Sequence, residues 1–154
     1  MIQRIQTVYM LIAEFLIGTL FFVPFGKITG KGGEIYRVGM NGIFSEGIPK
    51  PEMISRNLPL IILGVVILIV IFMTILLFKN RKRQMKLTVF NMFLILALEG
   101  LIFYDVSSGA TLVSGQYSMT LFSVFPIIAT ILIYLAYRSI SKDEMLVRSI
   151  DRIR

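Results

Sequence analysis

Four long apolar segments alternate with shorter polar segments along the chain. The apolar segments cover about residues 3–25, 58–78, 87–104 and 118–138. A helix rises about 1.5 Å per residue, so segments of this length reach roughly 30 Å, the thickness of a bilayer's hydrocarbon core. The sequence therefore predicts an all-α membrane protein, with four transmembrane helices in a single domain. Pro126, in the middle of the last segment, predicts a bend there.

The polar segments predict the connections between these helices. Residues 26–57 are rich in glycine and contain charges of both signs, as an exposed outer loop does. Polar and apolar residues alternate from Glu34 to Val38, directly after a glycine-rich turn at 30–33, and this pattern predicts a small β-hairpin within the loop. The remaining segments are predicted to be an inner basic loop, a second outer loop and a tail: residues 79–86, 105–117 and 139–154.

Basic residues lie mainly on one side of this predicted topology. Lysine and arginine beside spanning helices are retained on the cytoplasmic side of a membrane. That side would contain Arg4, Lys79, Arg81, Lys82, Arg83, Lys86, Arg138, Lys142, Arg148, Arg152 and Arg154, whereas the basic residues of the opposite side all lie in the long first loop. We therefore expect both termini in the cytoplasm. The basic loop should fix the orientation and contact anionic lipid.

Composition narrows the range of functions. The chain is 56% hydrophobic with a mean hydropathy of +0.81, which exceeds what a water-soluble core requires. It has no cysteine and no histidine, so thiol chemistry and the commonest general base are absent. The net charge of +7 fits membrane topology better than nucleic acid, because no basic run carries base-stacking aromatic residues. We expect no catalytic residues, cofactor, metal or nucleic-acid partner.

Polar residues within three of the apolar segments recur at helical spacing, and we call them the polar seam. They are Gln3, Gln6, Thr7 and Glu14 in the first segment, Thr88, Asn91 and Glu99 in the third, and Ser123 and Thr130 in the fourth. Because polar groups avoid lipid, the first, third and fourth helices are predicted to pack seam to seam. The second helix should expose most of its surface to lipid.

The two carboxylates of the seam allow two interpretations. Helical rise places Glu14 about 15 Å and Glu99 roughly 20 Å from the basic flanks, so both lie deep in the apolar region. They could form a proton- or cation-coupled site. Alternatively, they could be protonated groups that hydrogen-bond across the bundle to Thr130, Ser123 or Thr19. The sequence leaves both open.

The two ends of the chain carry distinctive sequences, MIQRIQT at the start and KDEMLVRSIDRIR at the close. With the apolar segments between them, they make the chain resemble an uncharacterised bacterial family of four-helix integral membrane proteins, known only as a domain of unknown function. The resemblance covers essentially the whole chain. It implies an inner-membrane protein and adds no mechanism.

The tail has an apolar and a basic side from about Ile140 onward, which predicts a short amphipathic helix. Such a helix either lies among lipid headgroups or docks on a partner protein, and both interpretations stay open. The residues concerned are Leu146, Val147, Arg148, Ile150, Arg152 and Ile153.

Three classes of function remain. The first is a non-enzymatic accessory or structural subunit that binds other membrane or envelope proteins, with a homo-oligomer left open. The second is a small proton-coupled transporter using Glu14 and Glu99. Glu14 is similar to the helix-one glutamate of small multidrug-resistance exporters, but the long first loop and the absence of tryptophan depart from that family. An enzyme using Glu14, Glu99 and Asp105 comes third, because no nucleophile or metal constellation accompanies these residues.

Overall fold

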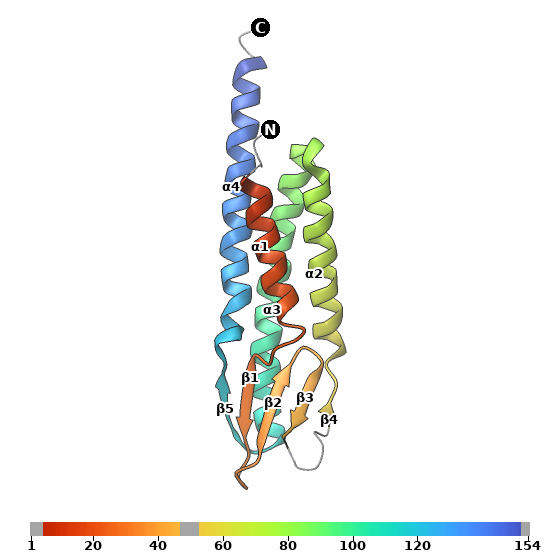
Figure 1. Ribbon diagram of the computed structural model, residues 1–154, viewed down its shortest axis with the longest axis vertical. Helices are drawn as coiled ribbons and strands as arrows, with labels where there is room; N and C mark the ends of the chain where they lie inside the picture. Colours follow the sequence, from red (N-terminus) through yellow and green to blue (C-terminus); the bar gives the residue numbers. More distant parts are fainter. Residues whose placement is uncertain (1–4, 47–52, 152–154) are drawn as a thin grey trace.

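The computed structural model describes residues 5–46 and 53–151. Within this part of the chain, four helices form an elongated bundle, and a small antiparallel sheet lies at one end of it (Figure 1). The helices are α1 (Ile5–Thr19), α2 (Leu58–Leu76), α3 (Arg81–Leu112) and α4 (Phe125–Asp151), with two short 3-10 helices, η1 (Leu77–Lys79) and η2 (Leu121–Val124). We call the end with the sheet the sheet end, and the end where α3 begins the basic end.

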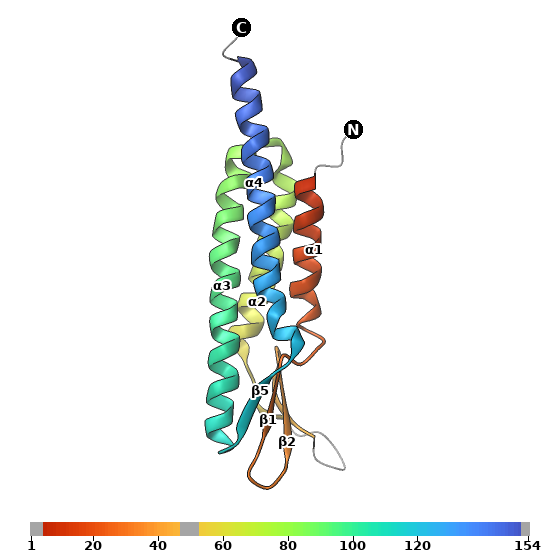
Figure 2. The same cartoon turned by 90° about the vertical axis from the view of Figure 1, so that its left-hand side faces the viewer.

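The helices pack as a ring in which α4 contacts both α1 and α3, and α2 contacts α3 and, less extensively, α1 (Figures 1 and 2). The first and third helices therefore meet mainly through α4 rather than directly. The second helix does not stand apart from the others. One side of α2, which includes Gly64 and Thr74, is buried against its neighbours.

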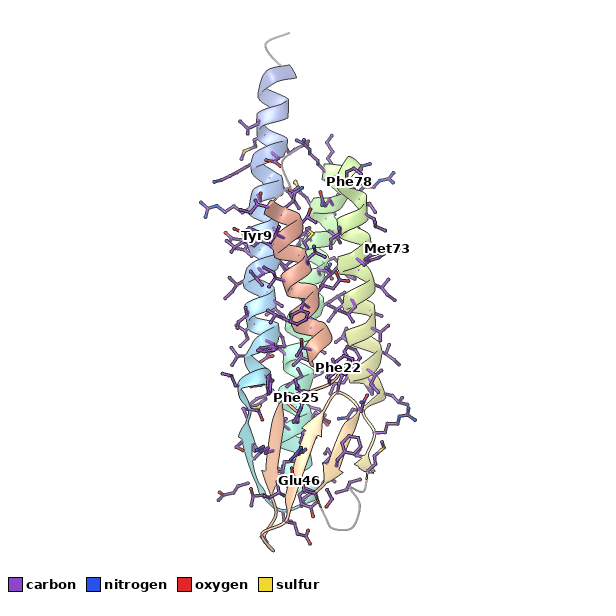
Figure 3. All side chains as sticks on the ribbon, in the orientation of Figure 1. Tyr9, Phe22, Phe25, Glu46, Met73 and Phe78 are labelled. Carbon is purple, nitrogen blue, oxygen red and sulfur yellow. The ribbon has the colours of Figure 1, made fainter. Side chains whose placement is uncertain are left out.

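The exterior of the bundle is apolar. Three of the described helices, α2, α3 and α4, are long and apolar enough to cross a membrane, whereas α1 is shorter. Large apolar side chains project outward around the bundle, as Met73 and Phe78 do near the basic end (Figure 3). A water-soluble protein rarely exposes such a large apolar surface, and a membrane protein does.

The sheet contains five strands in the order β4-β3-β2-β1-β5. The predicted hairpin is confirmed as the antiparallel pair β1 (Gly26–Thr29) and β2 (Ile35–Gly39), with Gly33 at positive φ in its turn. It is part of a larger structure, because β3 (Gly42–Ser45) and β4 (Met53–Ser55) continue the sheet on one side. On the other side β1 pairs with β5 (Gln116–Met119), which connects the two predicted outer loops.

The last three turns of α3 support the sheet. The prediction of a loop at 105–117 is wrong for most of this segment, because α3 continues to Leu112. Val106, Gly109 and Ala110 are buried at this end of the helix. A Cβ on Gly109 would lie 2.7 Å from Ile43 Cδ1 and 3.0 Å from Ile28 Cδ1, so the helix backbone and the sheet are in close contact.

The hydroxyl groups at the serine-rich end of α3 are hydrogen-bonded within the helix. Ser107, Ser108 and Thr111 each donate a hydrogen bond to the carbonyl three residues earlier in the helix. Such local bonds do not themselves favour a helix, so it is the buried packing against the sheet that outweighs the turn preference of serine and glycine.

Two other helix boundaries also differ from the sequence prediction. The first helix ends at Thr19 rather than near residue 25, because the chain turns at 20–23 ahead of Pro24, and proline disfavours helical geometry in the residue before it. At the basic end, the connection between α2 and α3 is confined to η1 and Asn80. Most of the predicted basic loop at 79–86 therefore forms the first turns of α3.

The fourth helix is a single continuous element. It begins at Phe125, so Pro126 lies in the first turn, where no intrahelical hydrogen bond is lost, and the predicted mid-helix bend is absent. The expected separate C-terminal helix is also absent, since α4 runs on to Asp151 and extends beyond the rest of the basic end (Figures 1 and 2). No glycine or proline interrupts the sequence between Ile127 and Asp151.

Candidate functional site

The polar seam is densest in the basic-end half of the bundle, where the structure adds Gln84 of α3, a residue that the sequence analysis did not include. Gln84, Thr88 and Asn91 on α3 and Gln6 on α1 are all buried. The Gln84 side-chain amide donates to the Thr74 carbonyl at 3.2 Å, which joins α3 to α2. The Thr88 hydroxyl donates to the Gln84 carbonyl at 2.8 Å. This part of the seam therefore also involves α2, which the sequence prediction left out.

Several seam atoms have no hydrogen-bond partner among the described residues. They are Gln6 Oε1, Gln84 Oε1, Glu99 Oε2 and both polar atoms of the Asn91 amide. Buried polar groups are nearly always hydrogen-bonded, and one without a partner costs on the order of 1–3 kcal/mol. Asn91 is the residue with the largest number of such atoms within the described part of the chain.

The two glutamates lie on different flanks of the bundle. Both are half-buried. Ile5 and Tyr9 line the crevice that α1 forms with α4, and helical periodicity places Glu14 on the opposite flank of α1. Met85 and Val89 line the crevice that α3 forms with α4, and the same reasoning places Glu99 toward α4.

The hydroxyl groups that the sequence analysis suggested as hydrogen-bond partners of the glutamates donate instead to backbone carbonyls of their own segments. Thr19 donates to the Phe15 carbonyl at 2.8 Å, and Thr130 donates to the Pro126 carbonyl at 2.9 Å. Ser123, which is buried, donates to the Thr120 carbonyl at 2.8 Å. Thr7 is half-buried beside Gln6, whereas Gln3 lies outside the described residues.

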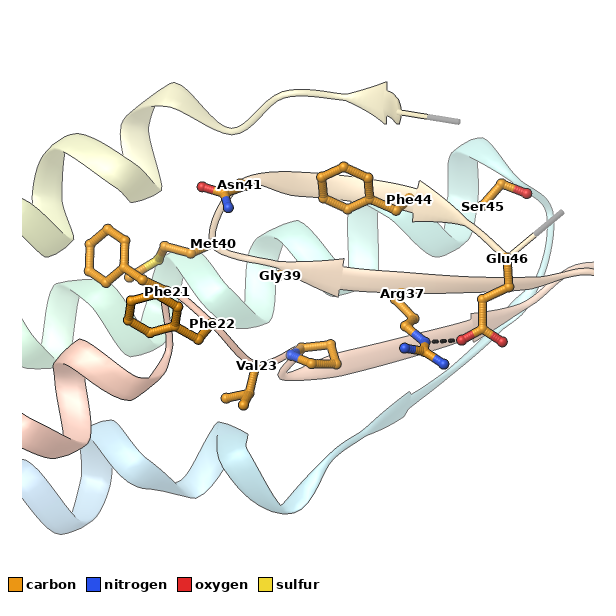
Figure 4. Close-up of a pocket in the computed structure, with 11 residues that line it drawn as sticks. Phe21, Phe22, Val23, Arg37, Gly39, Met40, Asn41, Phe44, Ser45 and Glu46 are labelled. Atoms are coloured by element: carbon orange, nitrogen blue, oxygen red, sulfur yellow. Dashed lines mark hydrogen bonds and ion pairs between the residues drawn. The ribbon is translucent and has the colours of Figure 1, made fainter. Parts of the chain in front are cut away.

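A groove of about 300 Å³ lies at the sheet end, where α1 leads into the sheet (Figure 4). Side chains alternate along a strand, so Arg37 and Phe44, which are register partners on β2 and β3, face away from α3. The segment at 21–24 forms the other wall, and its Phe22 side chain is 89% exposed. The ion pair between Arg37 and Glu46 marks the end of the groove remote from Phe22.

The sequence analysis missed this groove. It assigned Phe21 to Phe25 to the first transmembrane helix, so these residues were interpreted as part of a buried or lipid-facing surface. Pro24 is the signal that could have separated them from the helix. The position of Phe44 on the same face as Arg37 depends on the pairing of β2 with β3, which residue patterns alone did not establish.

Two crevices flank α4 at the basic end. One, of about 420 Å³, is lined by Lys82, Met85, Lys86 and Val89 of α3 and by Tyr137 of α4. The other, of about 320 Å³, is lined by Ile5 and Tyr9 of α1 and by Leu135, Arg138, Ser139 and Lys142 of α4.

Arg81, Arg83 and Leu146 are not among the described residues that line these crevices. Arg81 donates to the Asp143 carbonyl at 2.8 Å and so ties α3 to α4, and Arg83 is exposed. Leu146 is exposed near the end of α4. The side chains of Lys79, Val147, Arg148 and Ile150, and the whole of Arg152 and Ile153, lie outside the described residues. Among the described residues there is no group of three or more histidine, cysteine, aspartate or glutamate side chains that could hold a metal ion.

Comparison with protein families identifies a match over almost the whole chain. The model of a family described as a domain of unknown function (DUF4293) matches residues 2–153. The chain belongs to this family. No match was found among curated proteins. The family therefore covers the bundle and the sheet together, and its description assigns no activity to either.

Proposed function

We propose that this chain is a non-enzymatic integral protein of a bacterial inner membrane, an accessory subunit that binds another membrane or envelope protein at its sheet end. In this proposal the basic end lies in the cytoplasm with both termini, and the sheet end lies outside. The apolar exterior of the bundle and the lysines and arginines at its basic end support this arrangement.

The groove at the sheet end is the observation that carries the proposal. Its lining is mainly apolar, with Phe21, Phe22 and Phe44 beside the polar Asn41 and Ser45, and the Arg37–Glu46 ion pair supplies a charged end. Aromatic residues are enriched at the energetic centres of protein interfaces, whereas a polar rim fixes orientation. An extended apolar segment of a partner protein fits these features.

Capture of the partner from membranes tests the proposal. Phe22→Ala removes a side chain that is 89% exposed, so the fold should not change. If Phe22 is an interface anchor, its loss costs about 2 kcal/mol and weakens partner binding roughly 30-fold. Phe15→Ala is the matched control, because Phe15 is also exposed (74%) but lies on α1 outside the groove.

Full-length variants would be extracted in mild detergent, and the co-purified partner identified and quantified. Loss of one stoichiometric partner in Phe22→Ala alone supports the proposal. Equal recovery in both variants, or equal loss in both, contradicts it. A chain that lacks 140–154 tests in the same assay whether the tail also holds a partner.

A small proton-coupled transporter is the second candidate. It is favoured by Glu99, whose Oε2 atom is buried without a partner among the described residues on the same helix as Asn91. If Glu14→Gln and Glu99→Gln abolish a pH-driven flux in vesicles while partner capture persists, the transporter interpretation replaces the accessory one.

A further inference from the structure

The larger crevice at the basic end combines positive charge with an apolar wall. Lys82 and Lys86 are separated by one helical turn and therefore lie on the same side of α3. On the same side, Met85 lies between the two lysines and Val89 lies beyond Lys86. Tyr137 of α4 forms the opposite wall of the crevice. Among the described residues that line the crevice, none is acidic.

The apolar wall continues away from the lysines along the bundle. Phe93 and Leu96 on α3 are exposed one and two turns farther from the basic end, and Tyr134 is exposed one turn from Tyr137 on α4. A ligand of this surface must therefore carry an anion at one end and hydrocarbon directly next to it. A free anion would use only the lysines, and a soluble acidic protein would not use the apolar track.

We propose that the crevice between α3 and α4 binds one anionic phospholipid, with its phosphate held by Lys82, Lys86 and the Tyr137 hydroxyl and its acyl chains lying along Val89 and Phe93. Basic pockets between transmembrane helices on the cytoplasmic side bind anionic headgroups in this way. The inference rests on the membrane location in the proposed function, but not on the partner at the sheet end.

The crevice on the other side of α4 has a related composition. Arg138 and Lys142 are also one helical turn apart, and Tyr9 faces them from α1. A basic pair on one helix with a tyrosine from its neighbour thus occurs on both flanks of α4. This recurrence supports a position of α4 among phospholipid headgroups at its basic end, where basic and aromatic residues are enriched.

The test is lipid retention by the full chain, measured by native mass spectrometry during titration of the detergent-solubilised protein with phosphatidylglycerol or phosphatidylcholine. Each basic residue near an anionic lipid contributes about five-fold in affinity, so the double variant K82Q/K86Q should bind phosphatidylglycerol roughly 30-fold more weakly. K27Q/K31Q is the control, because it removes the same charge from exposed positions at the sheet end. Tyr137→Phe, which keeps the ring, should cause a smaller loss.

Three results would overturn the lipid site: equal weakening by both double variants, equal retention of phosphatidylcholine, or displacement of the lipid by millimolar inorganic phosphate, which would indicate a free-anion site. Partner capture is measured on the same preparations. If K82Q/K86Q keeps both its lipid and its partner, the lipid site fails while the accessory function stands. If lipid is lost only from K82Q/K86Q but Phe22→Ala keeps its partner, the lipid site stands and the accessory function fails.

Discussion

Two glycines on α3 allow a direct measurement of how firmly the sheet rests on this helix. A Cβ added at Gly100 meets nothing within 4 Å, whereas one added at Gly109 lies 2.7 Å from Ile43 Cδ1 and 3.0 Å from Ile28 Cδ1. Both positions are helical, so replacement by alanine gains at most about 1 kcal/mol of helix propensity at each. Only the substitution at Gly109 also overpacks the contact with the sheet.

The two effects predict opposite outcomes for the two variants. Overpacking a close contact costs about 1–3 kcal/mol, and the atoms met at Gly109 are flexible side-chain ends, so the lower part of that range applies. Gly100→Ala should therefore stabilise the protein by up to about 1 kcal/mol. Gly109→Ala should be about 1–2 kcal/mol less stable than Gly100→Ala.

Unfolding of both variants in detergent micelles, induced by heat or by SDS and followed by circular dichroism, measures this difference. Amide hydrogen exchange of β1 and β3 would locate it, since only Gly109→Ala should increase exchange in the sheet. If both variants are stabilised equally and the sheet amides exchange as in the parent chain, the sheet does not pack on α3 as described.

Three further predictions concern single contacts. Gly115→Ala should destabilise the protein by about 3 kcal/mol and increase amide exchange in β1 and β5. The added Cβ would lie 2.4 Å from the Thr29 carbonyl oxygen, a backbone atom that cannot move away. Unchanged exchange would refute the pairing of β1 with β5. The hydrogen bond that Tyr36 donates to Glu34, burial and the Glu34 charge raise the pKa of Tyr36 above 10.0. The contact between the two side chains therefore stabilises the fold fully below about pH 10, and this stabilisation is lost as the pH rises through the raised pKa. Glu34→Gln should lower that pKa in an ultraviolet titration, and no change would show that the contact is not made. Asn91→Leu should stabilise the bundle by about 1–3 kcal/mol in thermal unfolding, because it removes buried polar atoms without a described partner; destabilisation would mean that Asn91 is hydrogen-bonded in the native protein.

Local patterns in the sequence were sufficient to predict the helices and the first hairpin. Long apolar runs located all four helices, and the glycine turn before Glu34 located the pairing of β1 with β2. These features depend on residues close together in the chain. Helix ends were less accurate, because Pro24 and Pro126 act on the backbone at positions that hydrophobicity alone does not mark.

Features that depend on distant residues were missed. The pairing of Ile28 with Tyr117 joins segments on either side of two helices, and no local pattern in either strand indicates the other. The end of α3 was interpreted as a loop because of its serines and glycines. Ile102, Val106 and Gly109, buried at spacings of four and three, were the periodic signal that it continues as a helix.

In the candidate site, too, features that depend on helical spacing could be predicted from the sequence, whereas features that depend on distant residues could not. Gln6, Thr88 and Asn91 of the polar seam are buried, whereas Glu14, Glu99 and Thr130 are half-buried. That Glu14 and Glu99 lie on different flanks of the bundle could not be judged from spacing, because it depends on the order of the helices around the bundle. The groove at the sheet end depends on the fold of the sheet and was not visible in the sequence at all.

The orientation of the bundle is the central claim, and the absence of cysteine from the chain makes it directly measurable. Single cysteines would replace Lys31, exposed in the β1–β2 turn at the sheet end, and Arg83, exposed at the basic end. A membrane-impermeant thiol reagent applied to intact cells should label the cysteine at position 31 and should label that at position 83 only after the membrane is opened. Labelling of position 83 in intact cells, with position 31 protected, would contradict the account.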